Sequence, residues 1–462
     1  LISGNHAYGK DHHHDDDSRA YIRGGGVFID DGTATFDHSE ISNNRCYADG
    51  EEQYRYGSGV YSTGGTINLA NTSIVYNIDS DGIYRNDGTV NVVSSVIWGN
   101  SENDEGSINY SYTNRQGSAP GGDGNISKDP WFVDVLSSDY RLKPGSVCIN
   151  RGDVAEVDPD GTRRDMGASI YEHTHFGPLW YVSSDGDVLE GDGSQGNPLQ
   201  SILAGINMAN EGDEIIVSEG TYTGVGNYDI YFLGKDVYLH SESITVDDER
   251  SSIRSRNTRT DNSSAANTII DCGDNGRCMI FEPHGAYSGV SSEAVIEGFT
   301  IQNGYVNGSP GAGVRIENAS PTFINCIIQD NITYRHANNS YAEGGGVYAQ
   351  NSSSSFTNCS IINNRADAQV NSTHSHYAHA QGGGVHITGG SSNLTFTDCL
   401  ISGNYAYGRD HHYDDDSRAY IRGGGVFIDG GTATFDHSEI SNNQCDGAGE
   451  EQYRDGSGIY KD

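Results

Sequence analysis

One pattern of apolar, polar and glycine positions recurs along most of this chain. In each copy a glycine cluster precedes a short strand, a polar turn leads to a second strand that usually contains Phe, and a third strand ends at an Asn. Strands this short cannot bury an apolar face alone, but stacking the copies buries it. The copies cover residues 24–44, 57–77, 81–100, 311–331, 344–364, 382–404 and 423–443.

The repeats predict an all-β solenoid, a parallel β-helix with three short strands per turn. Equivalent residues of successive turns should form ladders inside it, and stacked Asn amides should bond to one another and to turn backbone groups. Three Cys residues that share one position are expected to form a further buried ladder. The ladder positions are Val314, Val347, Val385 and Val426; Phe323, Phe356, Phe396 and Phe435; Ile328, Ile361, Ile401 and Ile440; Asn331, Asn364, Asn404 and Asn443; Asn44, Asn77 and Asn100; and Cys326, Cys359 and Cys399.

Extra residues enter the longer turns at one place, between the closing Asn and the next glycine cluster. These inserts cover residues 332–343, 365–381, 405–422 and 444–455. Insertions at one point of a solenoid turn project from one face. We therefore expect a row of neighbouring loops on that face, rich in His, Tyr and Asp.

The first residues of the chain recur near its end. Residues 1–61 and 400–460 match in constant register, with few substitutions, among them His6 to Tyr405 and Asp31 to Gly430. A period of about 400 residues indicates an array of domains rather than stacking inside one domain. We interpret the chain as a little more than one unit of a tandem array.

Composition shifts suggest where one unit ends and the next begins. A solenoid needs its open ends covered. Residues 198–210 have helical spacing, and Pro198 suits a first helical turn, so a helix is expected to close the start of the second unit. The expected segments are the late turns of a first unit (1–126), a C-terminal cap rich in aromatic residues (127–172), a linker (173–179), an N-terminal cap (180–224) and the turns of the next unit (225–462).

The strongly acidic composition narrows the choice of partners. The chain has 64 Asp and Glu against 27 Lys and Arg, a formal net charge of -37. Nucleic acid and anionic membranes are therefore poor partners. The sequence has no run of 18 apolar residues, so no membrane span is expected within it.

The cysteines and sequons fit an exported protein, extracellular or at a cell surface. Cys272 and Cys278 flank a short GDNGR loop and are expected to form a disulfide, and Cys46 is a candidate partner for Cys148. Sequons offer glycosylation sites, although a chain rich in Asn, Ser and Thr also produces them by chance. The candidate glycosylation sites are Asn318, Asn331, Asn351, Asn371 and Asn393.

Three acidic clusters are candidate metal sites. Carboxylates suit Ca²⁺ and imidazole suits Zn²⁺. The alternatives are solvated loops, contacts with another protomer, or side chains that stabilise turns. The first cluster is Asp410, His411, His412, Asp414, Asp415 and Asp416, which repeats residues 11–17; the second is Asp158, Asp160 and Asp165; the third is Asp185, Asp187, Glu190 and Asp192.

Motifs along nearly the whole chain resemble a known family. The chain contains YVSSDGDV, GDGSQGNPLQSI and GDEIIVSEGTYTG before the second set of turns, TIIDCG and VIEGFTIQNGY within it, and DPWFVDVLSSDYRLKPGSVCINRGD in the cap. Together these resemble right-handed parallel β-helix repeat proteins with a choice-of-anchor type C-terminal module, and the first motifs are similar to the start of pectate-lyase-like proteins. The resemblance implies a right-handed solenoid and a secreted or surface location. It leaves function open, because this fold hosts lyases, adhesins and structural proteins.

Residue placement favours a non-enzymatic function. A lyase needs Arg or Lys beside Ca²⁺-binding carboxylates on neighbouring turns. Arg315 is a candidate base, but the sequence shows no paired Asp residues on the turns beside it. We expect a non-catalytic structural protein whose units assemble with one another, head-to-tail or laterally, into a fibre or surface appendage. An adhesin or glycan-binding rod is the first alternative, since Tyr can stack on sugars, and a polysaccharide lyase is the second. Ca²⁺ or Zn²⁺ is the expected cofactor, if there is one.

Overall fold

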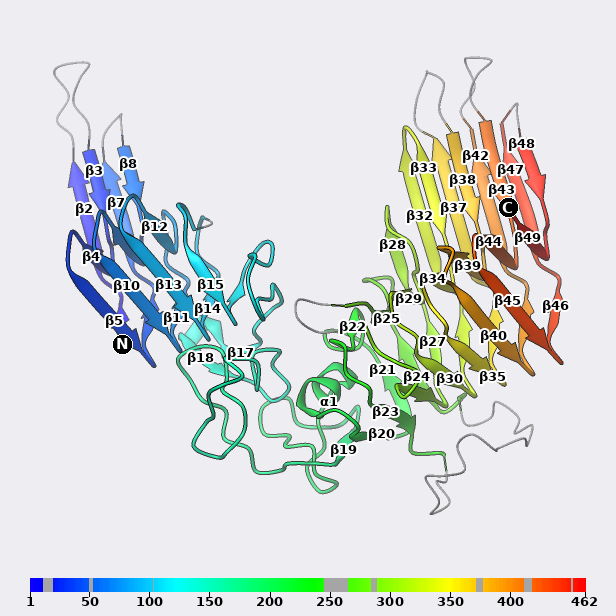
Figure 1. Cartoon of the computed structure of the whole chain (residues 1–462), viewed down its shortest axis with the longest axis horizontal. Coiled ribbons are helices and arrows are strands. Elements are labelled where there is room, and N and C mark those ends of the chain that lie inside the picture. The colour runs from blue at the N-terminus through cyan, green and yellow to red at the C-terminus, as the bar shows by residue number, and fades with distance from the viewer. Residues whose placement is uncertain are drawn as a thin grey trace. The chain divides into compact units, whose positions relative to one another are not determined.

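The computed structural model describes residues 1–10, 20–49, 53–102, 104–244, 265–283, 289–370, 377–410, 418–449 and 452–462. The chain divides into two compact units, Leu1–Thr174 and His175–Asp462, and the division falls within the segment expected to be a linker. Both units are built from parallel strands that stack turn upon turn (Figure 1). No helix among the described residues is long and apolar enough to span a membrane.

The body of the second unit is a right-handed parallel β-helix, which confirms the predicted fold. Complete turns add one strand to each of three sheets. Sheet one contains β19 (Leu179–Val182), β20 (Glu214–Val217), β23 (Tyr238–Ser241), β26 (Val295–Glu297), β30 (Thr322–Ile324), β35 (Ser355–Thr357), β40 (Asn393–Thr397) and β45 (Thr432–Asp436). Sheet two contains β21 (Gly220–Tyr222), β24 (Thr268–Asp271), β27 (Thr300–Gln302), β31 (Ile327–Gln329), β36 (Ser360–Ile362), β41 (Leu400–Ser402) and β46 (Glu439–Ser441). Sheet three contains β22 (Ile230–Tyr231), β25 (Met279–Phe281), β29 (Val314–Glu317), β34 (Val347–Gln350), β39 (Val385–Thr388), β44 (Val426–Asp429) and β49 (Ile459–Lys461).

The first unit has the same body with fewer turns. Its cap folds back beside the turns, because Tyr140 donates to Asn43 at 3.0 Å and stacks on Tyr76. The three sheets are β1 (Ile2–Ser3), β6 (Glu40–Ser42), β11 (Ser73–Val75), β14 (Val96–Trp98) and β16 (Asn114–Arg115); β5 (Thr33–Asp37), β10 (Thr66–Ala70), β13 (Thr89–Val93) and β15 (Asn109–Ser111); and β4 (Val27–Ile29), β9 (Val60–Ser62) and β12 (Ile83–Arg85). The cap contains β17 (Phe132–Asp134), a 3-10 turn at Val135–Ser137 and β18 (Asp139–Leu142).

The interior of the second unit contains the predicted ladders. Phe323, Phe356, Phe396 and Phe435 are in register, with successive ring centroids 5.0, 5.0 and 5.1 Å apart. The Val and Ile ladders align in the other two sheets. The thiols of the Cys ladder are buried and donate to backbone carbonyls. These ladders follow from stacking like side chains at the strand spacing of ~4.8 Å.

The Asn ladder joins successive turns at a buried corner. Asn364 Oδ1 accepts from the backbone N of Asn331 at 3.1 Å and from its Nδ2 at 2.9 Å, while Asn364 Nδ2 donates to the Ile328 carbonyl at 2.9 Å. The same contacts continue through Asn404 to Asn443, and they recur in the first unit. A Cβ at Gly346 would lie 2.9 Å from Asn364 Cγ, so the glycine cluster lets the chain pass over the ladder.

The described parts of the inserts form strands where we expected loops. Their ends are strands, which stack into two further sheets and give the longer turns five strands instead of three. We call each two-sheet projection a fin. In the second unit its sheets are β28 (Tyr305–Asn307), β32 (Ile332–Ala337), β37 (Arg365–Val370), β42 (Tyr405–Arg409) and β47 (Gln444–Ala448); and β33 (Ser340–Glu343), β38 (Tyr377–Gln381), β43 (Arg418–Arg422) and β48 (Gln452–Asp455). In the first unit they are β2 (His6–Lys10) with β7 (Arg45–Asp49), and β3 (Ala20–Arg23) with β8 (Gln53–Tyr56).

The helix that closes the start of the second unit is shorter than predicted. It is α1 (Ile202–Met208), and it packs its buried residues against β19, β20 and β22. Leu199 instead forms a parallel bridge with Val182. Ser201 then caps the helix by accepting from the backbone N of Ala204 at 3.3 Å. The residues from Pro198 to Ser201 therefore lie outside the helix.

The Asn ladder predicts a large effect of one substitution. Asn364→Ala should lower the free energy of unfolding by about 3 kcal/mol, because it leaves buried donors of Asn331 without their acceptor. Urea denaturation of the substituted and unsubstituted proteins measures this. Asn393→Ala, at an exposed position of the same unit, should change the value by less than about 0.5 kcal/mol. Equal effects of the two substitutions would contradict the structural role of the ladder.

Candidate functional site: the aromatic face of the fin

The fin of the second unit is held together by a narrow core. Residues alternate along its strands, and the inward ones are mostly Ala. Gly408 faces the largest of them, Ile421, and a Cβ there would lie 2.7 Å from Ile421 Cγ1. The small side chains hold the two layers close together and leave every second residue on an outer face. The core consists of Ala342, Ala366, Ala368, Val370, Ala378, Ala380, Ala406, Ala419 and Ile421.

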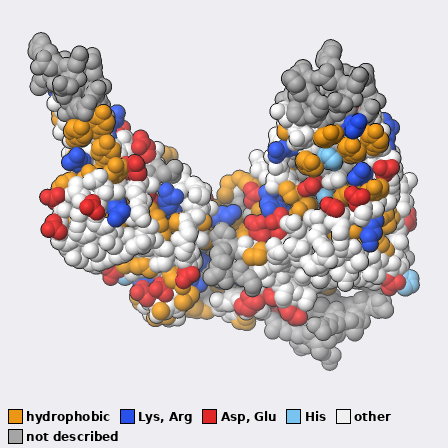
Figure 2. All heavy atoms as spheres, turned by 45° about the horizontal axis from the view of Figure 1, so that its top comes forward, with side chains coloured by type: hydrophobic (Ala, Val, Ile, Leu, Met, Phe, Trp, Pro, Cys, Tyr) orange, Lys and Arg blue, Asp and Glu red, His pale blue; other side chains and the backbone are white. Residues whose placement is uncertain are grey.

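One outer face of this fin carries a column of stacked rings, Tyr341, His379, Tyr420 and Tyr453, which we call the aromatic column. Successive ring centroids are 4.5, 4.9 and 5.1 Å apart, and successive ring planes differ by 6°, 16° and 14°. The four residues are in register on β33, β38, β43 and β48. Tyr341 and Tyr453 are 49% and 46% exposed. Figure 2 shows hydrophobic side chains gathered on this part of the unit.

Face-to-face stacking decides what the column presents to solvent. At these centroid distances each inner ring covers the flat faces of its neighbours. The edges of the rings and the Tyr hydroxyls remain outward. A sugar needs a free ring face on which to stack, so His379 and Tyr420 do not provide one. The column is better suited to packing edge-on against another protein surface.

The column is neutral although the chain is acidic. Burial, together with the charge of Arg422, lowers the pKa of His379 to about 4, so this ring is uncharged at neutral pH. Arg422 lies over Tyr420 and over Tyr460, with its guanidinium carbon 5.2 and 5.1 Å from the ring centroids. Burial also raises the pKa of the nearby Glu343 to about 7, and the charge of Asp429 adds to this effect. The ionic groups beside the column include Arg422 and Asp455, which pair at 3.8 Å.

The opposite face of the fin also carries charged groups. Arg365 pairs with Asp367 at 2.6 Å and lies over Tyr405 and Tyr407. Tyr405 donates to Asp446 at 3.3 Å. Both faces therefore combine aromatic rings with ion pairs, and the face of the aromatic column differs in its continuous row of four stacked rings.

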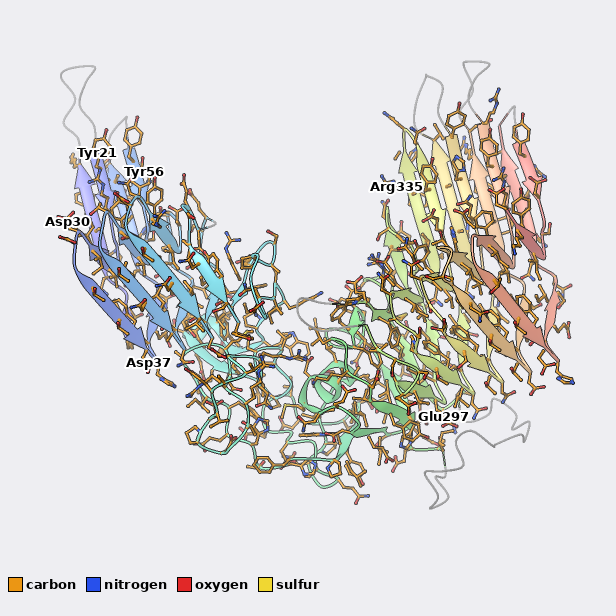
Figure 3. All side chains as sticks on the ribbon, in the orientation of Figure 1. Tyr21, Asp30, Asp37, Tyr56, Glu297 and Arg335 are labelled. Carbon is orange, nitrogen blue, oxygen red and sulfur yellow. A yellow bond between two sulfur atoms is a disulfide. The ribbon has the colours of Figure 1, made fainter. Side chains whose placement is uncertain are left out.

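The fin of the first unit carries two stacked rings at positions equivalent to part of the aromatic column. Tyr21 and Tyr54 stack at 5.1 Å and 14°, which are the values found for Tyr420 and Tyr453 at the equivalent positions. Figure 3 labels Tyr21 and Tyr56 on the fin of this unit. The opposite face differs between the copies, since Tyr8 stacks on Tyr47 in the first unit, whereas Tyr407 and Asp446 take these places in the second.

A buried histidine lies on the outer side of sheet three. His386 lies between Tyr348 and Phe427, with ring centroids 5.4 and 4.9 Å away. Neither of its ring nitrogens has a hydrogen-bond partner among the residues that the structure describes. Burial lowers the pKa of His386 to about 3. The sequence pattern gave no sign of this, because outward positions of a strand are normally exposed.

The cap carboxylates do not form the metal site that we predicted. The two oxygens of Asp158 accept from Arg164 at 2.8 Å and from the backbone N of Asp165 at 2.9 Å. Asp160 accepts from Thr162 and from the backbone N of His173. Asp165 accepts from the backbone N of Asn150 and of Tyr171, both at 2.7 Å, and burial raises its pKa to about 7. The carboxylates stabilise turns of the cap.

The other metal candidates are not brought together by the described residues. Asp410 is buried, and its side chain lies so close to Gly449 that a Cβ there would clash with it. Asp187 accepts from the backbone N of Leu189 and of Glu190, as in an Asx turn. Within the described ranges no group of three His, Cys, Asp or Glu residues has metal-site geometry. His411, His412, Asp414, Asp415 and Asp416 lie outside these ranges.

The sequons fall into different environments. Asn331 is fully buried in the Asn ladder, where its Nδ2 donates to Ile301 and Asn364. The prediction of a glycan there was wrong, since glycosylation requires an accessible amide. Asn318, Asn351 and Asn393 are exposed, and their use as glycosylation sites stays a prediction. Asn371 lies outside the described residues.

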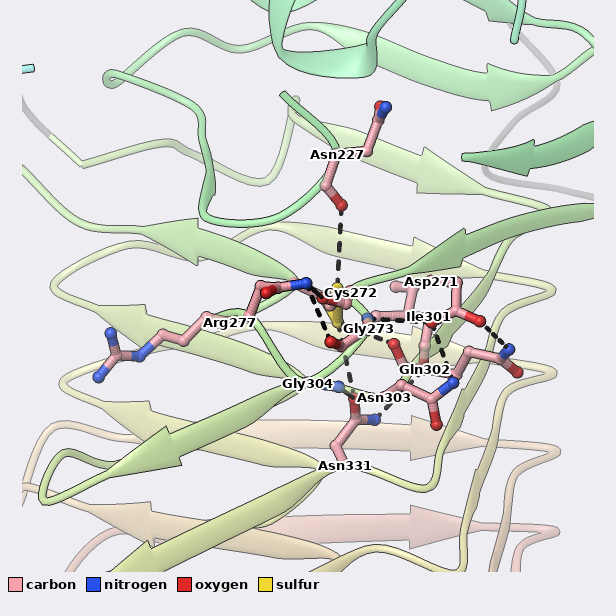
Figure 4. Close-up of a disulfide and its surroundings, with 12 residues drawn as sticks. Asn227, Asp271, Cys272, Gly273, Arg277, Ile301, Gln302, Asn303, Gly304 and Asn331 are labelled. Atoms are coloured by element: carbon pink, nitrogen blue, oxygen red, sulfur yellow. Dashed lines mark hydrogen bonds between the residues drawn. A yellow bond between two sulfur atoms is a disulfide. The ribbon is translucent and has the colours of Figure 1, made fainter. Parts of the chain in front are cut away.

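One of the two predicted disulfides is present and the other is not. Cys272 and Cys278 are bonded, with their Cα atoms 5.7 Å apart, which confirms the first pair. Figure 4 shows this bond near Asn331 of the Asn ladder. Cys46 and Cys148 are free thiols, so the second pairing was wrong. Cys46 is buried in the fin core of the first unit, whereas Cys148 belongs to the cap, where its thiol accepts from Asn114 at 3.1 Å.

Arg315 has carboxylate partners that the sequence did not reveal. It pairs with Glu317 on its own strand at 2.7 Å and with Glu282, from the preceding turn, at 3.5 Å. The side chain is only partly exposed. Both carboxylates therefore balance the guanidinium charge at the surface of sheet three.

Comparisons with known proteins support the fold. Residues 278–448 match the family model described as "Right handed beta helix region". No curated protein compared with the chain matches it. Among solved structures, the crystal structure of pectate lyase Pel9A is similar, with 11% sequence identity and a TM-score of 0.26 over 56% of this chain and 78% of that one. The family model thus agrees with the right-handed β-helix of the second unit and leaves its function open.

The environment of His386 predicts a pH-dependent effect of its replacement. The unfolded chain binds a proton at this residue below pH 6.5, whereas the folded chain does not until the pH approaches 3. Stability conferred by the neutral ring is therefore lost as the pH falls through this range. His386→Phe should raise the free energy of unfolding by about 1 kcal/mol at pH 7, and by about 2 kcal/mol more at pH 5.

Urea denaturation at the two pH values measures this difference. His336→Phe is the matched control, because His336 is exposed on the fin, and it should leave the pH dependence unchanged. A stability gain that is the same at pH 5 and pH 7 would contradict the assignment of a neutral buried ring to His386.

The cysteine arrangement predicts the thiol content of the protein. Of its eight cysteines, six are free. Alkylation of the denatured, unreduced protein should therefore modify six residues, and mass spectrometry should find Cys272 and Cys278 joined. Four modified residues, with a Cys46–Cys148 peptide, would contradict the structure.

Proposed function

We propose that the chain is part of a non-catalytic extracellular scaffold whose units associate through the aromatic columns of their fins. The observation that carries this proposal is the recurrence of the column. Tyr21 and Tyr54 of the first unit stack in the same way as Tyr420 and Tyr453 of the second. The two stacked rings are kept in both copies, although Tyr56 beside them is replaced by Asp455 in the second unit. A kept pair of stacked rings suits a contact that every unit makes.

The chemistry of the column supports association with protein. Large exposed aromatic surfaces usually mark interaction sites. The ring edges and the hydroxyls of Tyr341 and Tyr453 can pack between equivalent groups of a facing column and form hydrogen bonds there. Repulsion between acidic chains opposes the contact, and salt screens that repulsion. Lateral association should therefore strengthen as ionic strength rises.

A polysaccharide lyase is the alternative that one observation favours. Arg315 lies beside Glu282 and Glu317 on neighbouring strands, and a lyase needs a base close to carboxylates. Incubation with pectin, alginate and glycosaminoglycans in the presence of Ca²⁺ tests this alternative. Formation of unsaturated product that is lost in Arg315→Ala would favour it over the scaffold.

The scaffold proposal predicts loss of association when the column is removed. Tyr341→Ser, Tyr420→Ser and Tyr453→Ser in one chain should weaken self-association at least about tenfold, because each buried interface aromatic contributes on the order of 1 kcal/mol or more. Sedimentation velocity over a range of protein and salt concentrations measures the effect, and electron microscopy shows the form of the assemblies.

Removal of aromatic residues from the opposite face is the matched control. Tyr334→Ser with Tyr407→Ser changes the same type of residue on the same fin and should leave association near its original strength. Circular dichroism establishes that each variant folds. A chain that stays monomeric at every salt concentration would overturn the proposal, and so would equal association of the column variant and the unsubstituted chain.

A further inference from the structure

A second surface of the second unit has different chemistry. A shallow trough of about 830 Å³ follows the turns between sheet three and sheet one. Its walls come from three successive turns, represented by Asn318, Asn351 and Ser391, and from the segment around Val290. The trough therefore runs from turn to turn, with equivalent positions ~4.8 Å apart.

The lining of this trough is uncharged. Amide groups of Asn318 and Asn351 and hydroxyls of Ser320, Ser353 and Ser391 supply its polar surface, and Val290 with Ala319 supplies apolar surface. None of the residues that line it is Asp, Glu, Lys, Arg or His. This is unusual in a chain with a formal net charge of -37.

A directed series of hydrogen bonds orients the amides. Ser391 donates to Asn351 Oδ1 at 3.1 Å, and Asn351 Nδ2 donates to Asn318 Oδ1 at 3.1 Å. The series leaves the Nδ2 group of Asn318 at its end, where no described residue accepts from it. The Asn318 side chain is thus fixed with its donor exposed in the trough before any ligand binds.

The rim of the trough is also built by specific contacts. The backbone N of Ser291 donates to Asp236 at 2.7 Å, and the Val290 carbonyl accepts from the backbone N of Ser320 at 2.8 Å. A Cβ at Gly289 would lie 1.9 Å from the Asn318 carbonyl oxygen. Glycine therefore allows this segment to pass directly over the turn and to close one side of the trough.

We propose that the trough binds a neutral polysaccharide along the axis of the β-helix. Sugar hydroxyls both donate and accept, as Asn amides and Ser hydroxyls do, and the C–H face of a sugar fits the apolar surface of Val290 and Ala319. The acidic field of the chain disfavours anionic polymers. Repetition over three turns lets one polymer make several weak contacts together. This site is separate from the aromatic column, and its proposal does not depend on self-association.

Affinity gel electrophoresis with laminarin, dextran, galactomannan and polygalacturonate tests the proposal. At least one of the three neutral polymers should retard the unsubstituted chain, and polygalacturonate should not. Asn318→Asp should weaken the retardation at least tenfold, because a carboxylate keeps the acceptor for Asn351 but replaces the outward donor. Ser353→Ala should weaken it to a smaller extent.

Asn442→Asp is the matched control. Asn318 and Asn442 are both exposed, and both have φ in the left-handed region, at 48° and 55°, which Asp also tolerates. Thermal unfolding establishes that the variants fold. Mass spectrometry tests Asn318 and Asn351 for a glycan, and a glycan on either residue, which would occupy the trough, overturns the proposal. Retardation that Asn442→Asp leaves intact and Asn318→Asp removes supports the site. Absence of retardation by any neutral polymer, or equal retardation of both variants, overturns it.

Discussion

In-register stacking at the spacing of β-strands is the constraint on which the rest of the structure depends. Each turn must place the same kind of side chain above its predecessor, or a buried group loses its partner. The Asn ladder shows this requirement most clearly. The amide of Asn331 donates to the side-chain oxygen of Asn364, and the amide of Asn364 donates to the side-chain oxygen of Asn404. Glycines such as Gly346 are required where the chain crosses the ladder. One rule of repetition therefore produces ladders inside, at the corners and on the fins.

Much of this repeated arrangement of side chains could be predicted from the sequence. The interior ladders follow from apolar residues at fixed positions, and the short disulfide loop from the spacing of Cys272 and Cys278. The fins were missed because their outward residues are polar and aromatic, which suggested loops. The signal was the alternation of Ala in the inserts, as at Ala366 and Ala368 or Ala378 and Ala380, which gives a strand one narrow buried face.

The candidate sites were harder to predict, because they depend on distances between turns. Nothing in the spacing of Cys46 and Cys148 shows that one lies in a fin core and the other packs within the cap. The acidic residues of the cap look like metal ligands in sequence, but backbone donors such as that of Tyr171 occupy their oxygens. Conversely, the partners of Arg315 become apparent only when β25 and β29 are side by side.

The uneven number of strands per turn has a mechanical consequence. In a solenoid each turn is bonded mainly to its two neighbours, so a pulling force along the axis passes through every interface in series. Interfaces between long turns share that force among five pairs of strands, whereas the described residues of the turns near α1 contribute strands only to the three body sheets. Under tension the second unit should therefore yield first between α1 and β28, while the turns that carry the fin remain closed.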